Sequence, residues 1–249
     1  MLPSKLFMLC WLALIVTACA GGTNSQAIVR IGIDAALPPF EATTADPKVF
    51  AGFDIDVAQA LAAQAGVKIE FVDLRIESLI PQVANCKLDG GISLIPISPN
   101  LGSQALVSNS YYSATHVVAV KKGNLLITDE TKLAGMSVGV QAGSSSEDQA
   151  RSLSIVPARS YLSPFLAFQD LALGAIDAVI ADKPRAEYFA NTKPYNVKIV
   201  GAGFGQIDYG MIFCPQRLEL QTTMNAALKS IQADGTLERL KQKWNVGGK

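Results

Sequence analysis

GAIDAVIADKPRAEYFAN, residues 174–191, contains a strand and a helix in immediate succession. The apolar run Ala178–Ala181 is typical of a buried strand, and Asp182 ends it. Pro184 is favoured in the first turn of a helix, so we expect that helix over Pro184–Asn191. A strand that passes directly into a helix is half of the unit from which parallel sheets are built. The stretch therefore predicts an α/β fold.

The same alternation runs outward from this stretch in both directions. It predicts strands over 28–33, 67–72, 91–95, 117–120, 137–140 and 197–200, with a further apolar run at 211–213. It predicts helices over 54–65, 78–85, from about 144, 164–173, 218–233 and 236–244. Strands that alternate with helices indicate parallel sheets with helices on both faces.

Composition excludes several classes of protein. The chain has 249 residues, of which 49% are hydrophobic and 17% charged, so it is a folded protein of one or two domains. Lys and Arg number 21, as do Asp and Glu, and this balance gives no indication of a nucleic-acid partner. His116 is the single histidine, so a histidine-rich metal site is excluded. GAGFG at 201–205 has no helix after it and does not indicate a dinucleotide site. We predict no cofactor and no metal.

The first residues have the form of an export signal. Lys5 precedes an apolar run at 6–16, which is too short to span a membrane but is typical of a signal peptide. The run ends in VTAC at 16–19, which resembles the bacterial lipobox. We expect a signal peptide over 1–18, then a lipidated Cys19 and a flexible tether over 19–27. The alternative is an ordinary secretory signal cut near Ala18 or Ala20. Lipidation would anchor the chain at the periplasmic or extracellular face of a membrane.

Cys86 and Cys214 are the two cysteines left beyond the signal. In an exported protein they could form a disulfide, and they could equally be two buried, inert thiols. If the strand at Gly91 and the strand that ends at Cys214 are neighbours, the two sulfurs could approach each other. A disulfide requires that the two Cα atoms lie within about 7 Å. The disulfide is the alternative that a structure can test.

Eight stretches have the order and spacing of one family. They are RIGIDAALPPFE (30–41), GFDIDVAQALA (52–62), SLIPQV (78–83), SNSYYS (108–113), VAVKKGN (118–124), VGVQAGSSSEDQA (138–150), GAIDAVIAD (174–182) and ADGTLERLKQKW (233–244). From about Ile28 to Trp244 the chain resembles the extracytoplasmic substrate-binding proteins of polar amino-acid ABC importers, solute-binding protein family 3. The resemblance implies a two-lobe periplasmic-binding-protein-like fold of type II, with two crossover strands as a hinge. Lobe one would take residues 28–116 and 210–249, and lobe two 117–209.

The family resemblance also implies a function. The chain would be a monomer that captures a small polar solute, either an amino acid or an amino-acid-like cationic compound, between its lobes. It would deliver this solute to a membrane permease and would not be an enzyme. One alternative is a periplasmic enzyme similar to cyclohexadienyl dehydratase, which acts on prephenate or arogenate. Glu77 and His116 are the candidate acid–base groups for such an enzyme. The other alternative is a sensor subunit for a membrane receptor.

Several polar residues stand where the family binds its ligand. Asp182 matches the aspartate that pairs with the ligand's ammonium, and Asp34 lies at the equivalent edge of lobe one. The turn that contains Gln141 and Ser144 would face the cleft. Ser144 and Glu147 fit a capping box, in which the serine side chain caps the helix. A helix N-terminus also attracts an anionic group.

Lobe one departs from the family pattern. Leu101 stands in place of the arginine that grips the ligand's carboxylate, and Pro96 replaces a Ser or Thr. Leu37 and Ile76 replace flat side chains, and Leu94 replaces a small one. Arg75 or Arg185 could substitute for the missing cation, but we expect both to be solvated surface residues.

The predicted ligand lacks a free carboxylate that must be buried. We expect weak binding of ordinary polar amino acids, and a preferred ligand that is cationic or partly apolar, such as an amine or a guanidino compound. The complete predicted ligand-binding set is Asp34, Leu37, Phe53, Ile76, Ser93, Leu94, Pro96, Leu101, Gln141, Ser144, Ser145 and Asp182. Of these, Leu37, Ile76, Leu94 and Leu101 would line the apolar side of the ligand.

Overall fold

The computed structural model describes residues 27–155 and 158–246 of the chain. The predicted signal peptide, the lipidated Cys19 and the tether up to residue 26 lie outside the described residues. Within the described ranges, no helix has both the length and the apolar character that crossing a membrane requires.

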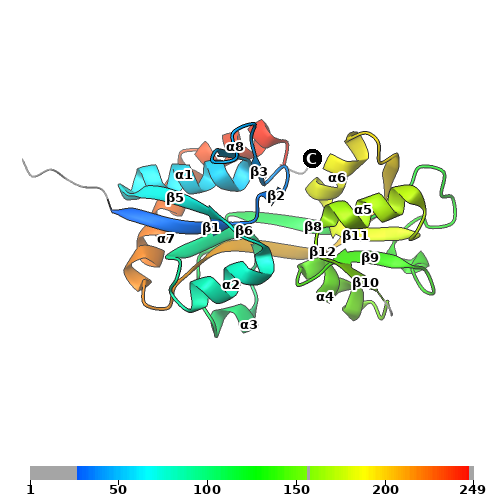
Figure 1. Ribbon diagram of the computed structural model, residues 1–249, viewed down its shortest axis with the longest axis horizontal. Helices are drawn as coiled ribbons and strands as arrows, with labels where there is room; N and C mark the ends of the chain where they lie inside the picture. Colours follow the sequence, from blue (N-terminus) through cyan, green and yellow to red (C-terminus); the bar gives the residue numbers. More distant parts are fainter. Residues whose placement is uncertain (1–26, 156–157, 247–249) are drawn as a thin grey trace, which may run out of the picture.

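One mixed sheet runs along the molecule (Figure 1). Its strands follow the order β10-β9-β11-β8-β12-β6-β1-β5, with β7 paired to β12. Their bounds are β1 Ile28–Ile33, β5 Lys68–Asp73, β6 Gly90–Pro96, β7 Leu106–Val107, β8 Tyr112–Lys121, β9 Val138–Gln141, β10 Arg159–Tyr161, β11 Ala178–Asp182 and β12 Val197–Phe213. A small second sheet contains β2 Ala36–Leu37, β3 Glu41–Thr43 and β4 Phe50–Ala51.

Two long strands connect the halves of the molecule. β8 and β12 pair antiparallel from Tyr112↔Tyr209 to Lys121↔Val197. β8 also pairs with β11, and β12 also pairs with β6. β7 pairs antiparallel with β12, whereas β1 is parallel to β5 and β6, and β9 is parallel to β10 and β11. The predicted fold, with its parallel-rich sheets and two crossover strands, is confirmed.

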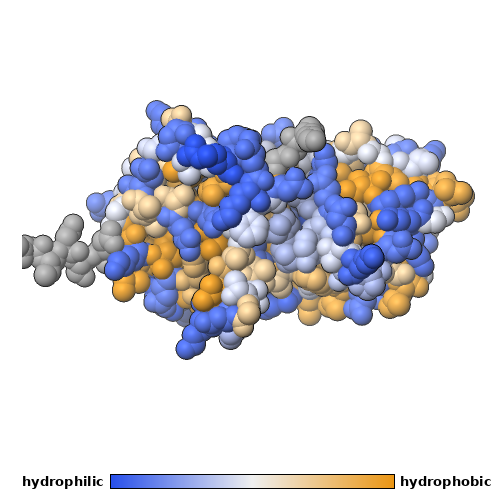
Figure 2. Space-filling model, turned by 90° about the horizontal axis from the view of Figure 1, so that it is seen from above, coloured by the Kyte–Doolittle hydropathy of each residue, from blue (hydrophilic) through white to orange (hydrophobic). Residues whose placement is uncertain are grey.

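The helices cover both faces of the sheet. Their bounds are α1 Phe53–Ala65, α2 Ile76–Ala84, α3 Pro99–Gly102, α4 Ser145–Ser152, α5 Pro164–Leu173, α6 Lys183–Asn191, α7 Leu218–Ala233 and α8 Thr236–Trp244, with a 3-10 turn over Glu130–Lys132. Seen from above, hydrophobic residues are visible on the surface toward the end of the molecule that carries α5 (Figure 2). Leu166 and Leu173 of that helix are exposed.

Four hydrophobic clusters fill the interior, two in each half. In one half, α1, α7 and α8 pack on β1 around Phe53, and α2 packs on β6 around Leu79. In the other, α5 and α6 pack on β11 around Phe189, and α4 packs on β9 around Val140. We keep the names lobe one and lobe two for these halves; the residue boundaries between them stay a prediction.

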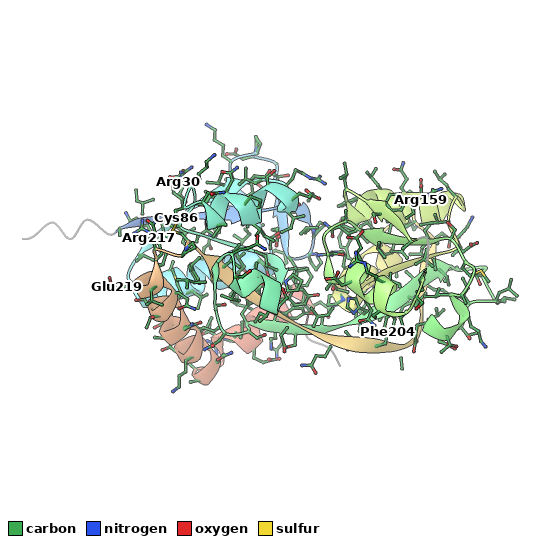
Figure 3. The ribbon with its side chains drawn as sticks, turned by 90° about the horizontal axis from the view of Figure 1, so that it is seen from below. Arg30, Cys86, Arg159, Phe204, Arg217 and Glu219 are labelled. Carbon is green, nitrogen blue, oxygen red and sulfur yellow. A yellow bond between two sulfur atoms is a disulfide. The ribbon has the colours of Figure 1, made fainter. Side chains whose placement is uncertain are left out.

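A disulfide joins Cys86, just after α2, to Cys214, just after β12. The Cα atoms are 4.9 Å apart, inside the limit stated for this pair. The two strands near these cysteines are also neighbours, as the disulfide requires, because β6 and β12 pair antiparallel. Cys86 lies near Arg217 at the far end of lobe one, well away from Phe204 on the crossing strand (Figure 3).

Candidate functional site

A narrow cleft is lined by residues of both lobes. Nine of the twelve predicted ligand-binding residues line it: Leu37, Ile76, Ser93, Leu94, Pro96, Gln141, Ser144, Ser145 and Asp182. Six further residues complete the lining: Ile80, Ile95, Ala142, Gly143, Arg185 and Tyr209. The free volume inside the cleft is about 30 Å³, so the lobes are closed on each other.

Asp182 is the acidic group of the cleft. It is the last residue of β11 and the N-cap of α6, and it is buried. Its carboxylate accepts a hydrogen bond from the Tyr209 hydroxyl and pairs with the Arg185 guanidinium, with 3.1 Å between Nη1 and Oδ2. This is the carboxyl end of a strand, the place at which open α/β sheets bind their ligands.

Arg185 lies in the cleft and not on the surface. The expectation of a solvated residue was wrong, because only 4% of its side chain is exposed. A spacing of three residues puts Arg185 on the same side of α6 as Asp182, and its Nη1 also donates to Gln141 Oε1 at 3.2 Å. Arg75, by contrast, is 48% exposed; it pairs with Glu77 and donates to the backbone carbonyl of Leu162.

The turn between β9 and α4 brings polar groups to the lobe-two wall. Gly143 has φ +69°, a conformation that favours glycine. The predicted capping box does not form as expected: the Ser144 hydroxyl donates to the Gln141 carbonyl and does not cap α4. Glu147 instead accepts from the Gly143 N–H at 2.9 Å and from the Ser160 hydroxyl, and these bonds lower its pKa.

Ser145 begins α4 and faces both the cleft and the crossing strands. Its Oγ lies 3.3 Å from Nε2 of His116 on β8 and 3.4 Å from the hydroxyl of Tyr209 on β12. His116 Nδ1 is buried with no hydrogen-bond partner among the described residues, and burial lowers the pKa of His116. His116 is therefore neutral at pH 7. Its contact with Ser145 connects the long strand β8 to the start of α4.

The lobe-one wall is apolar apart from one hydroxyl. Leu37, Ile76, Leu94 and Pro96, four of the positions at which lobe one departs from the family pattern, line it. Ser93 supplies the hydroxyl, which donates to the Glu41 carboxyl behind the wall. A ligand would meet aliphatic surface on this side and charge on the other.

A buried pair of carboxyl groups lies behind Ser93. Glu41 and Asp54 are both 0% exposed. Asp54 Oδ2 accepts from the Leu94 N–H at 3.0 Å and the Tyr111 hydroxyl at 2.9 Å. Burial raises the pKa of Glu41 well above its usual value and raises the pKa of Asp54 to about 6. Sequence reasoning missed this pair, because Asp54 has the pattern of an ordinary acidic residue in the first turn of a helix.

Three predicted ligand-binding residues do not line the cleft. Asp34 accepts from the backbone N–H groups of Ala36 and Ile76 at 3.3 and 3.1 Å, so it holds the end of β1 to the start of α2. Phe53 is fully buried and packs edge-on against Phe40 and Tyr112. Both side chains make these contacts inside lobe one and not in the cleft.

Leu101 is the third residue outside the cleft. It is 6% exposed and packs in the cluster of α2, with Leu79 and Ile95. It lines a neighbouring cavity that shares Ile76, Ile80 and Gly143 with the cleft. A leucine at this position joins the core because it carries no charge to place toward the cleft.

Tyr209 is the residue that sequence reasoning had the least chance of finding. It lies on β12, one of the two expected crossover strands, but no motif in the sequence marks its hydroxyl as part of a site. Among the described residues, no group of three or more His, Cys, Asp or Glu side chains could hold a metal ion.

Comparison with known proteins gives one consistent result. The family model for bacterial extracellular solute-binding proteins, family 3, matches residues 29–247. ABC transporter arginine-binding protein 1 of Escherichia coli is 29% identical, over 94% of this chain and 97% of its own length. The arginine-binding extracellular protein ArtP of Bacillus subtilis is 30% identical, over 96% and 99%. The L-cystine-binding protein TcyJ of E. coli is 28% identical, over 89% and 84%.

Solved structures of the same two-lobe form are similar over most of the chain. An ancestral arginine-binding protein bound to arginine has a TM-score of 0.82 at 34% identity, covering 88% of this chain and 98% of its own. The ancestral amino acid-binding protein AncCDT-1, a precursor of cyclohexadienyl dehydratase, has a TM-score of 0.80 at 32% identity, covering 88% and 95%. ArtJ of Geobacillus stearothermophilus, which binds arginine, lysine and histidine, has a TM-score of 0.81 at 28% identity, covering 89% and 96%.

Proposed function

Since this chain belongs to the bacterial extracellular solute-binding proteins of family 3, we propose that it is the substrate-binding component of an ABC importer and captures a small cationic solute between its lobes. The observation that carries the ligand class is Asp182, a buried carboxylate in the cleft whose ionic partner is a guanidinium. Relatives named for arginine binding support the same class, because arginine carries a guanidinium of its own.

The lobe-one wall supports a ligand whose positive end matters most. Burying a carboxylate without a paired cation costs several kcal/mol. Leu101 offers no such cation, the wall beside Ser93 is aliphatic, and the guanidinium of Arg185 is already paired with Asp182. The carboxylate of an amino acid therefore adds little to binding here, and a guanidino or amino group supplies the specificity.

A thermal unfolding panel tests the ligand class. The purified protein is heated with arginine, lysine, agmatine, glutamate and leucine, each at the same ionic strength. A ligand at about 100 times its Kd adds about 2.7 kcal/mol of stability. We expect arginine or agmatine to raise the Tm and glutamate and leucine to leave it unchanged. Stabilisation by glutamate or leucine alone would contradict the proposed class.

A binding role is favoured over the dehydratase alternative by the placement of the two candidate groups. Glu77 lines the cavity beside Leu101, and His116 lines a different cavity at the strand crossing. Neither residue lines the cleft, so they do not form an acid–base pair around one substrate. We therefore expect no dehydration of prephenate or arogenate by the purified protein; product formation would favour the enzyme.

The partners and the location follow from the family and from the first residues of the sequence. The VTAC pattern supports a lipid anchor at Cys19, with a monomer held outside the cytoplasmic membrane beside its permease. Cys19→Ala should release the protein from the membrane fraction. A mature N-terminus at Ala20 or beyond with no lipid, found by mass spectrometry, would overturn the anchor. A sensor role remains the second candidate; a permease and an ATPase encoded beside this chain favour import.

A further inference from the structure

Arg185 is buried in the cleft although it comes from the first turn of a helix. Its Nη1 contacts Asp182 Oδ2 at 3.1 Å and Gln141 Oε1 at 3.2 Å. Arg151 offers a direct comparison, because it also pairs with an aspartate three residues earlier. That pair is 69% and 78% exposed, whereas Arg185 and Asp182 are each 4% exposed. The spacing alone therefore does not bury an Arg–Asp pair.

The cleft satisfies the guanidinium of Arg185 only in part. Its Nε is buried and has no hydrogen-bond partner among the described residues. A buried donor without an acceptor costs free energy. An occupant that leaves one donor unpaired is held less firmly than a ligand that can pair all of its donors. Arg185 can therefore be replaced.

The space in the cleft makes replacement necessary. With Arg185 in place the free volume is about 30 Å³, which has room for only a few water molecules. No amino acid or amine fits beside the arginine. A solute that reaches Asp182 in the closed protein must take the volume that Arg185 now fills.

The charges around Arg185 select what can replace it. Among the described residues that line the cleft, Asp182 is the one acidic side chain and Arg185 the one basic side chain. Behind Ser93, the charge of Arg185 also lowers the pKa of the buried Glu41 and Asp54 carboxyls, against the larger effect of their burial. Asp182 is the carboxylate in contact with the guanidinium, and a neutral or acidic replacement would leave it buried without a cation.

We propose that Arg185 is a built-in occupant of the cleft. Its guanidinium holds the place of the ligand's cationic group on Asp182 and Gln141, and a solute binds by displacing it. Arg185 is then a specificity-determining residue, since only a cation can take over its ion pair. The identity of that solute as the transported one rests on the proposed function, but the occupancy of the cleft by Arg185 does not.

Removing the arginine tests this directly. In Arg185→Ala, methylguanidinium at millimolar concentration should raise the Tm in a saturable manner, because it refills the vacated site. Sodium chloride at the same ionic strength is the reference for salt effects. The wild type and the matched control Arg151→Ala should show no saturable shift, and adding Asp182→Asn to Arg185→Ala should abolish it. Absence of the shift in Arg185→Ala would overturn the proposal.

Calorimetric titration with arginine is the second test, and it measures the Kd of each variant. Removing an occupant that fills the site about 90% of the time or more strengthens the apparent affinity about tenfold or more. Arg185→Ala should therefore bind arginine at least about tenfold more tightly than the wild type. A loss of binding would overturn the proposal, because it would show that Arg185 pairs with the ligand's carboxylate.

A second variant guards against a failure to fold. Arg185→Gln keeps a polar side chain in the cleft but no cation, and it is tested with the same two ligands and the same expected results. If no form of the protein binds arginine or agmatine, the proposed ligand class fails. The methylguanidinium shift still decides whether Arg185 is the occupant.

Discussion

Two elements hold the Asp182 carboxylate: it accepts a hydrogen bond from Tyr209 on the crossing strand and forms an ion pair with Arg185 of its own helix. Asp182→Asn leaves the buried guanidinium without an ionic partner. Breaking a buried ion pair on one side costs about 3–5 kcal/mol. We therefore expect the variant to lose stability of this order in urea unfolding. The double variant Asp182→Asn with Arg185→Gln should recover part of this loss. If Asp182→Asn alone were as stable as the wild type, the ion pair would not contribute to stability as we expect.

The Glu41 and Asp54 carboxyls give stability a pH dependence whose direction follows from burial. Their pKa values are raised in the folded state, that of Asp54 to about 6. Between about pH 4, where they titrate when unfolded, and these raised values, the folded protein holds more protons. Stability contributed by the pair is thus present below about pH 4 and is lost as pH rises past 6.

Glu41→Gln isolates this contribution. Between pH 4.5 and pH 8 the variant should lose less stability than the wild type, because it no longer has the Glu41 carboxyl whose pKa burial raises. Chemical denaturation at both pH values measures the free energy of unfolding of each protein. The difference between variant and wild type removes the contribution of His116 and the surface carboxyls, which both proteins share. Parallel pH profiles for the two proteins would show that the pair does not titrate in this range.

Individual residues were predictable where a motif fixes their position. Asp182 follows a buried strand and precedes a helix with Pro184, so the sequence locates it at a sheet edge. Arg185 three residues later has no such signal, because its direction depends on which side of α6 meets the other lobe. Glu41 and Asp54 were missed for the same reason, since their burial is a property of the folded lobe.

At the scale of elements, periodic segments were predicted well, and the crossing strands were predicted to exist but not at their full length. The helix expected over 164–173 has those bounds, whereas the strand expected over 197–200 continues to Phe213. Gln206 and Asp208 interrupt its apolar pattern where β12 passes between the lobes. A strand that leaves one core and enters another has no single buried face, so neither periodicity describes it.

The disulfide ties α2 to the end of β12 across 128 residues of sequence. Removing a native disulfide typically costs about 2–5 kcal/mol. Cys86→Ser with Cys214→Ser should therefore lower stability by this order in a denaturant titration. The Kd for a ligand should stay within about threefold, because neither cysteine lines the cleft. An unchanged midpoint of denaturant unfolding would mean that the disulfide contributes little to stability.

At the scale of the whole molecule, the closed cleft connects the two lobes directly. Arg75 of lobe one donates to the carbonyl of Leu162 of lobe two, and Arg185 lines the cleft together with residues of the lobe-one wall. The two-lobe architecture followed from eight matching stretches in the sequence. The closed state did not, because it depends on which side chains fill the space between the lobes.

Small-angle scattering tests what holds the lobes together. If Arg185 occupies the cleft, Arg185→Ala should have a larger radius of gyration than the wild type without ligand. Saturating arginine should restore the smaller value, since a ligand favours the form in which it contacts both walls. Equal radii of gyration for the two ligand-free proteins would show that Arg185 does not hold the lobes closed.

The most direct test of a cation site at Asp182 is calorimetry that compares the two ends of the ligand. Arginine and agmatine, which lacks the carboxylate, are titrated into the wild type and into Asp182→Asn. We predict that losing the carboxylate changes Kd by less than about tenfold, whereas losing one partner of a buried charge pair weakens binding by roughly 30- to 5,000-fold. Submicromolar binding of arginine that is lost in agmatine and unaffected by Asp182→Asn would contradict the account.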